Sequence, residues 1–167
     1  RYIEKLHDDL FFIDRLIEKW NYYSDDPKLD TFKRHLLPTL LDPARNPSGL
    51  LVIFTESADT LRAVGHAIES VDPDLPVLTV TSANRRDVEP QLRANFDANY
   101  RGTPRSDFRI LVTTDVLAEG INLHRANTIL NYDTPWNATR LMQRIGRVNR
   151  IGSTADRVYV YNFMPSV

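Results

Sequence analysis

The chain has 167 residues, and 42% of them are apolar, which is enough for one packed domain of ordinary size. Its 21 basic and 22 acidic side chains give a net charge of −1, so total charge argues neither for nor against a nucleic-acid partner. The absence of cysteine excludes a disulfide framework and thiolate catalysis.

The sequence also lacks targeting signals. It has no apolar run of about 18 residues, the length that would suggest a transmembrane helix, and Arg1 begins no recognisable signal peptide. We therefore expect a cytoplasmic protein with no membrane partner. Because the first residue is arginine rather than methionine, we also expect this chain to be a piece of a longer protein.

The charges are distributed unevenly along the chain. Residues 50–100 hold four arginines and eight acidic residues, whereas residues 101–152 hold eight arginines and four acidic residues. The second of these segments is therefore basic, although the whole chain is nearly neutral.

The N-terminal part reads as helical. Apolar residues recur at helical spacing over residues 2–20, which predicts an amphipathic helix. Asp26 and Pro27 then form a cap followed by a proline at the first helical position, so a second helix is expected to end before Pro43. We divide the chain into a helical segment, 1–25, which either covers part of the domain or belongs to an insertion, and a domain, 26–167.

From residue 50 onward, short apolar runs alternate with helical patterns. The first run is uninterrupted, as expected of a strand buried on both faces of a sheet, and similar runs recur. The runs cover residues 50–54, 77–80, 110–113, 128–131 and 158–161, and the helical patterns cover about 58–70, 86–99 and 137–149. This alternation predicts an α/β domain with a parallel sheet.

Polar residues follow the first, third and fourth runs. The carboxyl ends of parallel strands form the ligand crevice of an open α/β sheet, so we expect these residues to meet at one edge. They are Thr55–Ser57, Thr113–Leu123, and Tyr132–Asp133 with the helix that follows.

The segment Gln143–Arg150 carries three arginines on a predicted helix. At 3.6 residues per turn, Gln143, Arg147 and Arg150 share one face, and an apolar stripe lies opposite. One guanidinium group can hydrogen-bond two phosphate oxygens at once, which suits a site where negative charge builds up on phosphate. A solvated basic helix face is the alternative interpretation.

Three of these segments together resemble the motifs of superfamily-two helicases and translocases. Ile53–Ser57 is similar to motif IV, Thr114–Leu123 to motif V, and Gln143–Arg150 to motif VI. Asp26–Leu29 and Tyr132–Asn137 resemble the Swi/Snf-type branch, which includes bacterial RNA-polymerase-recycling and phage-defence ATPases. The resemblance spans about residues 26–163 and implies a RecA-like (P-loop NTPase-type) C-terminal lobe with extra N-terminal helices.

The resemblance also implies roles for individual residues. Arg147 and Arg150 match paired arginines that reach ATP across a cleft, and Gln143 matches a residue that links the nucleotide site to motif V. Glu119, Gly120 and Asn122 match positions near the nucleotide. Thr55, Ser57, Ser82 and Thr114 correspond to positions that contact a nucleic-acid backbone. Asp115 is expected to cap the following turn and orient motif V.

Other parts of an ATPase site are missing from the sequence. None of the six glycines precedes lysine, so no phosphate loop is present, and no Asp-Glu pair exists to hold magnesium. We therefore expect ATP and Mg²⁺ to be held mainly by a first RecA-like lobe of the same parent chain. The fragment alone is expected to lack ATPase activity.

Several alternatives stay open at this stage. A DEAD-box RNA helicase lobe is less favoured, because that type has histidine where this chain has Gln143 and arginine-glycine where it has Glu119-Gly120. Double-stranded DNA is therefore the favoured nucleic acid. A non-catalytic α/β binding domain is a further alternative. Arg140 and Arg144 are either solvated or in contact with DNA. Arg85 and Arg86 are expected on a helix-start surface, and the alternative is that they line a nucleic-acid groove.

The histidines carry no pattern of metal ligands. They are His7, His35, His66 and His124, scattered along the chain without ligand spacing. We expect them to be structural, and we expect no metal site within this chain.

Overall fold

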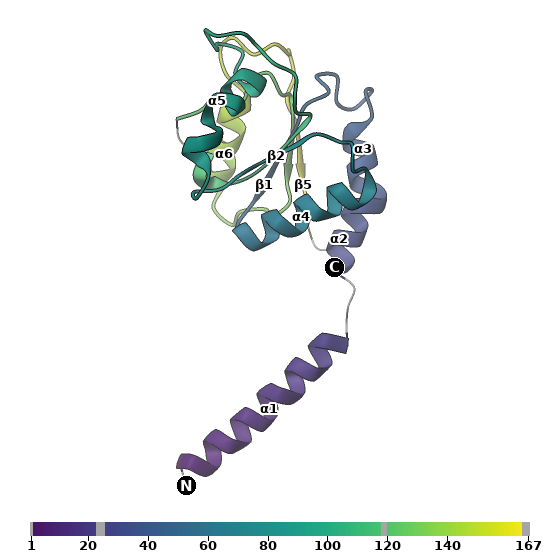
Figure 1. Cartoon of the computed structure of the whole chain (residues 1–167), viewed down its shortest axis with the longest axis vertical. Helices are drawn as coiled ribbons and strands as arrows, with labels where there is room; N and C mark the ends of the chain where they lie inside the picture. Colours follow the sequence, from purple (N-terminus) through teal and green to yellow (C-terminus); the bar gives the residue numbers. More distant parts are fainter. Residues whose placement is uncertain (1, 23–25, 118–119, 165–167) are drawn as a thin grey trace.

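The computed structural model describes residues 2–22, 26–117 and 120–164, with a five-stranded, all-parallel sheet at the centre of the domain (Figure 1). Its strands are β1 (Leu51–Thr55), β2 (Val77–Val80), β3 (Ile110–Thr114), β4 (Thr128–Asn131) and β5 (Tyr159–Asn162). They lie in the order β2-β3-β1-β4-β5. The predicted parallel α/β fold and all five predicted strands are confirmed.

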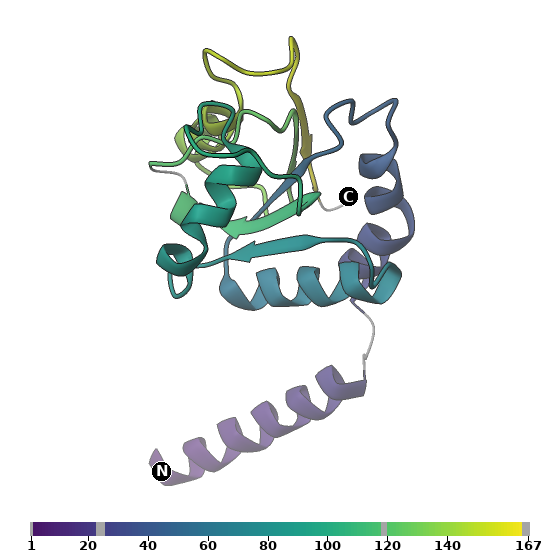
Figure 2. The same ribbon diagram turned by 45° about the horizontal axis from the view of Figure 1, so that its top comes forward.

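Helices cover both faces of this sheet, as Figures 1 and 2 show. One face carries α4 (Ala58–Val71) together with the helical stretch 27–41. The other face carries α5 (Arg85–Phe96) and α6 (Ala138–Val148). Residues of β1 alternate between the two cores, so Leu51 and Ile53 pack in the first and Val52 and Phe54 in the second. This double burial explains why the strand sequence is apolar throughout.

The predicted second helix is continuous but not regular. It comprises α2 (Pro27–Thr31), the π-helical turn η1 (Phe32–Leu36) and α3 (Leu37–Leu41). Pro38 has no N–H and its ring would clash with the carbonyl four residues back in an α-helix, so the wider turn accommodates it. At the start, the Asp26 carboxylate accepts from the backbone N–H groups of Lys28 and Leu29 at 2.9 and 3.0 Å. The predicted cap is confirmed.

The first helix, α1 (Tyr2–Tyr22), lies apart from the sheet domain (Figures 1 and 2). Its apolar side chains are exposed along the whole helix, and Trp20 is 81% exposed. The expectation that this segment covers part of the domain is therefore wrong. The division at residue 25/26 and the insertion alternative stay predictions. Within the described ranges, no helix is both long and apolar enough to cross a membrane.

Candidate functional site

Three of the residues predicted to contact nucleic acid lie at the carboxyl edge of the sheet. Ser57, Ser82 and Thr114 follow or end β1, β2 and β3, which are neighbours in the sheet. Ser57 and Ser82 are exposed, and Thr114 is half-buried. Ser57 also caps α4, since its Oγ accepts from the backbone N–H of Thr60 at 3.0 Å. The expected position at this edge is confirmed for Ser57 and Thr114, and Ser82, after β2, lies at the same edge.

Thr55 occupies the same edge but cannot share that role. It pairs with Thr114 in the β1–β3 register and is 0% exposed. Its hydroxyl donates to the Ser57 carbonyl at 3.2 Å, within the turn that leads into α4. The prediction that Thr55 contacts nucleic acid is wrong for its side chain, because the hydroxyl is used inside the fold.

The basic helix buries one of its arginines completely. Arg144, on α6, is 0% exposed, and its guanidinium lies 5.2 Å from the centre of the Phe54 ring. Its Nη1 donates to the Asn131 side chain at 3.0 Å and to the Asp133 carbonyl at 2.8 Å. Its Nε donates to Asp115 at 2.6 Å. Both expectations for Arg144, solvation and DNA contact, are wrong.

The contacts of Arg144 also give Asp115 a role in the fold. The Asp115 carboxylate accepts from the Arg144 side chain of α6, and its role as a cap of the following turn stays a prediction, because Ala118 and Glu119 fall outside the described residues. The residue still orients the segment after β3, because the ion pair joins that segment to α6. Arg140, 3.9 Å from the same carboxylate, is mostly exposed.

Of the other two arginines, Arg147 lies further along α6 and Arg150 follows the helix. The helix ends at Val148, with Asn149 as its C-cap, so Arg150 stands beyond the helix. The prediction that Arg150 shares a helix face with Gln143 and Arg147 is therefore wrong. The apolar stripe is confirmed, since Val148 is buried and Ile145 is half-buried.

The course of α6 also determines where these arginines lie relative to the sheet. The helix runs from the carboxyl end of β4 back toward the start of β5, so each successive turn lies further from the carboxyl edge. Arg144 contacts Asn131, the last residue of β4, and is near that edge. Arg147 and Arg150 therefore lie further from that edge, and they meet the predicted polar segment at its far end, at Leu123 and Asn122.

The end of α6 is nevertheless joined to the predicted nucleotide segment. The backbone N–H of Leu123 donates to the Arg147 carbonyl at 2.8 Å. Arg150 donates from Nη1 to the side-chain oxygen of Asn122. Two residues of motif VI therefore contact two adjacent residues of motif V. Gln143 is exposed one turn before Arg147.

Gly120 lies on the surface of the same segment with φ of +89°, a conformation that favours glycine over other residues. A Cβ at this position would lie 3.2 Å from Nη2 of Arg85. Arg85 also donates from Nη1 to the Val116 carbonyl at 3.0 Å. Arg85 lies at the start of α5, as expected, and its half-buried side chain also contacts this segment. Glu119, also predicted to lie near the nucleotide, falls outside the described residues.

His124, just after this segment, is buried beneath the loop that contains Arg150. Its Nδ1 is 3.6 Å from Oδ1 of Asp97. Burial lowers the pKa of His124, the Asp97 carboxylate opposes this shift, and Arg150 lowers the pKa further. In the described ranges, no group of three or more histidine, aspartate or glutamate side chains could hold a metal ion.

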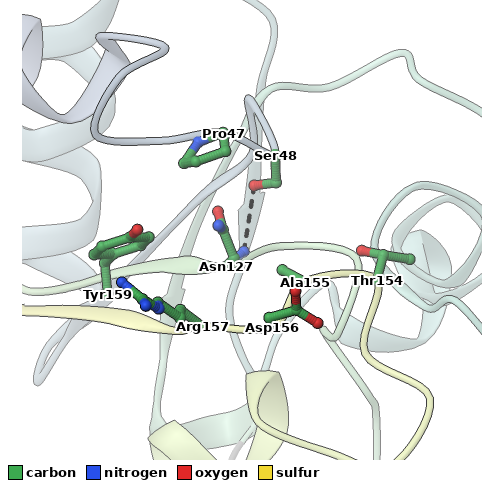
Figure 3. A pocket seen from close by; sticks show the side chains of 8 residues that line it. All are labelled: Pro47, Ser48, Asn127, Thr154, Ala155, Asp156, Arg157 and Tyr159. Atoms are coloured by element: carbon green, nitrogen blue, oxygen red, sulfur yellow. Dashed lines mark hydrogen bonds between the residues drawn. The ribbon is translucent and has the colours of Figure 1, made fainter.

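A cavity of about 560 Å³ opens at the opposite, amino edge of the sheet (Figure 3). Its lining includes Ser48, Asn127 and Tyr159, and the Asn127 backbone N–H donates to the Ser48 hydroxyl at 3.3 Å. None of the residues predicted to act on nucleotide or nucleic acid lines it. This cavity is therefore separate from the candidate site.

Sequence comparisons identify several relatives. Residues 32–152 match the family described as the helicase conserved C-terminal domain. The uncharacterized ATP-dependent helicase YqhH of Bacillus subtilis is 48% identical over 58 residues, which are 35% of this chain and 10% of YqhH. The ATP-dependent RNA helicase DBP8 of Pyricularia oryzae is 28% identical over 128 residues, covering 77% of this chain and 21% of DBP8. The Zorya protein ZorD of Escherichia coli is 27% identical over 140 residues, covering 84% of this chain and 12% of ZorD.

A solved structure agrees with these matches. The C-terminal part of the Fun30 ATPase domain aligns with a TM-score of 0.65 and 19% identity, over 95% of this chain and 48% of that chain. This likeness supports the fold. The chain spans less than a quarter of the length of YqhH, DBP8 and ZorD. Because the family match covers most of the chain, the protein belongs to the helicase conserved C-terminal domain family, as the second RecA-like lobe of a superfamily-two helicase or translocase.

Proposed function

We propose that this lobe works in an ATP-dependent translocase that moves on double-stranded DNA in the cytoplasm. The observation that carries the proposal is the pair of contacts between the end of α6 and the segment after β3. The Arg150 side chain donates a hydrogen bond to the Asn122 side chain, and the Arg147 carbonyl accepts one from the backbone N–H of Leu123. A movement of either segment must therefore move the other.

The proposed nucleotide-facing part consists of the guanidiniums of Arg147 and Arg150 with Asn122, which is hydrogen-bonded to Arg150, and it includes Gly120 and Gln143 by their sequence positions. Cationic donors of this kind stabilise charge on the transferring phosphoryl group, an effect worth about 10³–10⁵ in rate. Glu119 belongs to the same proposal by its sequence position. The residues fit the edge of an ATP site rather than a complete one, since the chain has no phosphate loop and the described ranges have no metal-binding group.

ATP and Mg²⁺ are therefore proposed to be held mainly by a first RecA-like lobe of the same parent chain. When bound there, they supply the triphosphate and the charge that polarises it. The residues of this lobe would bind and orient the phosphates from the other side of the cleft. This division of the site is why we expect the fragment alone to be inactive.

The nucleic-acid-facing part consists of Ser57, Ser82 and Thr114 at the carboxyl edge. Hydroxyl and backbone N–H groups of this kind contact phosphates without reading the base sequence. Thr114 ends β3 directly before the segment that contains Gly120 and Asn122. The two proposed parts of the site are therefore continuous in the chain.

Duplex DNA is proposed rather than RNA because Gln143 and Glu119-Gly120 replace residues typical of DEAD-box RNA helicases. The second candidate, an RNA helicase lobe, is favoured by the 28% identity to an ATP-dependent RNA helicase. The two candidates differ in the polymer that stimulates hydrolysis.

The test is ATP hydrolysis by the full-length protein with duplex DNA, with RNA, and without nucleic acid. We expect duplex DNA to stimulate most and Arg150→Ala to lower the stimulated rate about 10³-fold. Arg157→Ala, which removes another exposed arginine, one that lines the amino-edge cavity, is the matched control and should keep wild-type turnover. Wild-type turnover in Arg150→Ala would disprove the role of this arginine, and greater stimulation by RNA would select the second candidate.

A further inference from the structure

The segment 115–122 joins the proposed nucleic-acid and nucleotide parts of the site. It follows β3, forms a short 3₁₀ turn at Asp115–Leu117, and is irregular at Gly120–Asn122. Side chains from elsewhere in the fold contact the described residues of this segment, Asp115–Leu117 and Gly120–Asn122. Two helices on the same face of the sheet supply them.

From α6, the contacts are those of Arg144 with Asp115 and of Arg150 with Asn122. They hold the first and last residues of the segment. Between these two contacts, Val116 and Gly120 are contacted by a residue of α5. This residue is Arg85, which lies outside the three motifs.

Arg85 contacts the segment at two points. Its Nη1 donates to the Val116 carbonyl at 3.0 Å, and its Nη2 lies 3.2 Å from where a Cβ on residue 120 would be. Glycine at 120 therefore meets two requirements, the positive φ and room for this guanidinium. The Arg85 guanidinium thus donates to the Val116 carbonyl and packs against Gly120.

The base of Arg85 is itself fixed. Arg85 is the first residue of α5, and its backbone N–H donates to the Thr81 carbonyl at 3.0 Å. The preceding Asn84 accepts from the Thr81 N–H at 2.8 Å and donates to the Thr79 carbonyl at 2.9 Å. The turn after β2 is thus tied to the sheet, and the guanidinium extends from a rigid support.

We propose that Arg85 is a positioning residue that fixes Asp115–Leu117 relative to Gly120–Asn122 and so couples nucleic-acid contact at Thr114 to nucleotide contact at Gly120 and Asn122. This coupling role rests on the proposed function, whereas the effect on the segment does not. Arg85 touches neither polymer nor nucleotide in this assignment. It acts through the segment that does.

The test compares Arg85→Met, Arg85→Lys and the control Arg86→Met in the full-length protein. Arg86 is the exposed neighbour on the same helix, so its variant matches the charge lost. Amide hydrogen exchange is measured at Val116 and at Gly120–Asn122, with β1 and β3 as internal references. In parallel, ATP turnover is measured with and without a duplex DNA oligonucleotide, and with RNA.

In Arg85→Met we expect exchange in the segment to rise about tenfold, as for the loss of one charge-assisted hydrogen bond, with β1 and β3 unchanged. Arg85→Lys, which keeps a positive charge and a donor at this position, should raise exchange less than Arg85→Met. The ratio of stimulated to unstimulated turnover should fall about tenfold in Arg85→Met and stay at the wild-type value in Arg86→Met. General destabilisation would lower both rates together and leave this ratio unchanged.

Unchanged exchange in the segment, or an equal rise throughout β1 and β3, would overturn the proposal. So would faster exchange with an unchanged stimulation ratio. If neither DNA nor RNA stimulates the wild-type protein, the proposed function fails and the coupling role fails with it. The exchange comparison would then still decide whether Arg85 sets the segment.

Discussion

Arg144 and Asp115 form an ion pair of 2.6 Å between Nε and Oδ1, with the arginine fully buried and the aspartate partly exposed. The pair joins α6 to the end of β3, two elements that are not neighbours in the chain. A guanidinium in the interior must keep its partners, because an uncompensated buried charge is very unfavourable. The Asn131 side chain and the Asp133 carbonyl provide the other contacts.

We expect Arg144→Met to lower the free energy of unfolding of this chain by about 3 kcal/mol, since it leaves the Asp115 carboxylate without its main partner. Urea denaturation measures the change. The matched control is Arg140→Met, which removes an exposed arginine 3.9 Å from the same carboxylate and should cost at most about 0.5 kcal/mol. Equal effects of the two substitutions would contradict a special role for the buried arginine.

The lowered pKa of His124 predicts a dependence of stability on pH. Below its ordinary pKa of 6.5, the unfolded chain binds a proton that the folded chain resists, so the stability contributed by the neutral imidazole is present above pH 6.5 and is lost as pH falls through the folded pKa. We expect the drop in unfolding free energy between pH 7.5 and pH 5, two chosen conditions, to be smaller in His124→Leu than in the wild type. Denaturation at both values measures it, and an identical drop would refute the assignment.

Thr55→Val should affect stability and leave nucleic-acid binding unchanged. The substitution removes the hydroxyl that donates to Ser57, which costs about 1 kcal/mol, and keeps the shape of the buried side chain. In the full-length protein, the Kd for duplex DNA should stay at the wild-type value, whereas Ser82→Ala, at an exposed position, should raise it. A raised Kd in a stably folded Thr55→Val protein would restore the role predicted from the sequence.

The isolation of α1 predicts that the domain does not depend on it. A chain of residues 26–167 should unfold at the same urea concentration as the whole chain, because α1 lies apart from the sheet domain. Its exposed apolar side chains should also make the longer chain associate more readily at high concentration, which sedimentation measures. A lower midpoint for the shorter chain would show that α1 supports the domain.

The sequence was sufficient to predict the sheet. A strand buried on both faces must be apolar at every position, and this local pattern is visible at Leu51–Phe54 without knowledge of its neighbours. The cap at Asp26 and the helix start at Pro27 are equally local, because the side chain satisfies backbone groups two and three residues ahead. The carboxyl-edge position of Ser57, Ser82 and Thr114 follows from the parallel direction of the strands.

The remaining parts of the site depend on contacts between distant segments. Nothing near Arg144 in the sequence distinguishes it from Arg140, because its partners lie at the ends of β3 and β4. The end of α6 at Val148 changes the position of Arg150, which a helical projection had put on one face with Gln143. The contact made by Arg85 could not be predicted for the same reason, since the carbonyl that accepts from it belongs to Val116, in the segment after β3.

The position of β1 in the middle of the sheet affects when the lobe can fold during its synthesis. Both strands that pair with β1, β3 and β4, are synthesised after it, and the nearer of them begins only at Ile110. A nascent chain that stops before Thr128 leaves one side of β1 with open backbone hydrogen-bonding groups. The lobe therefore matures in one late, cooperative event, and a cut or a fused partner placed between β1 and β4 would divide a single folding unit.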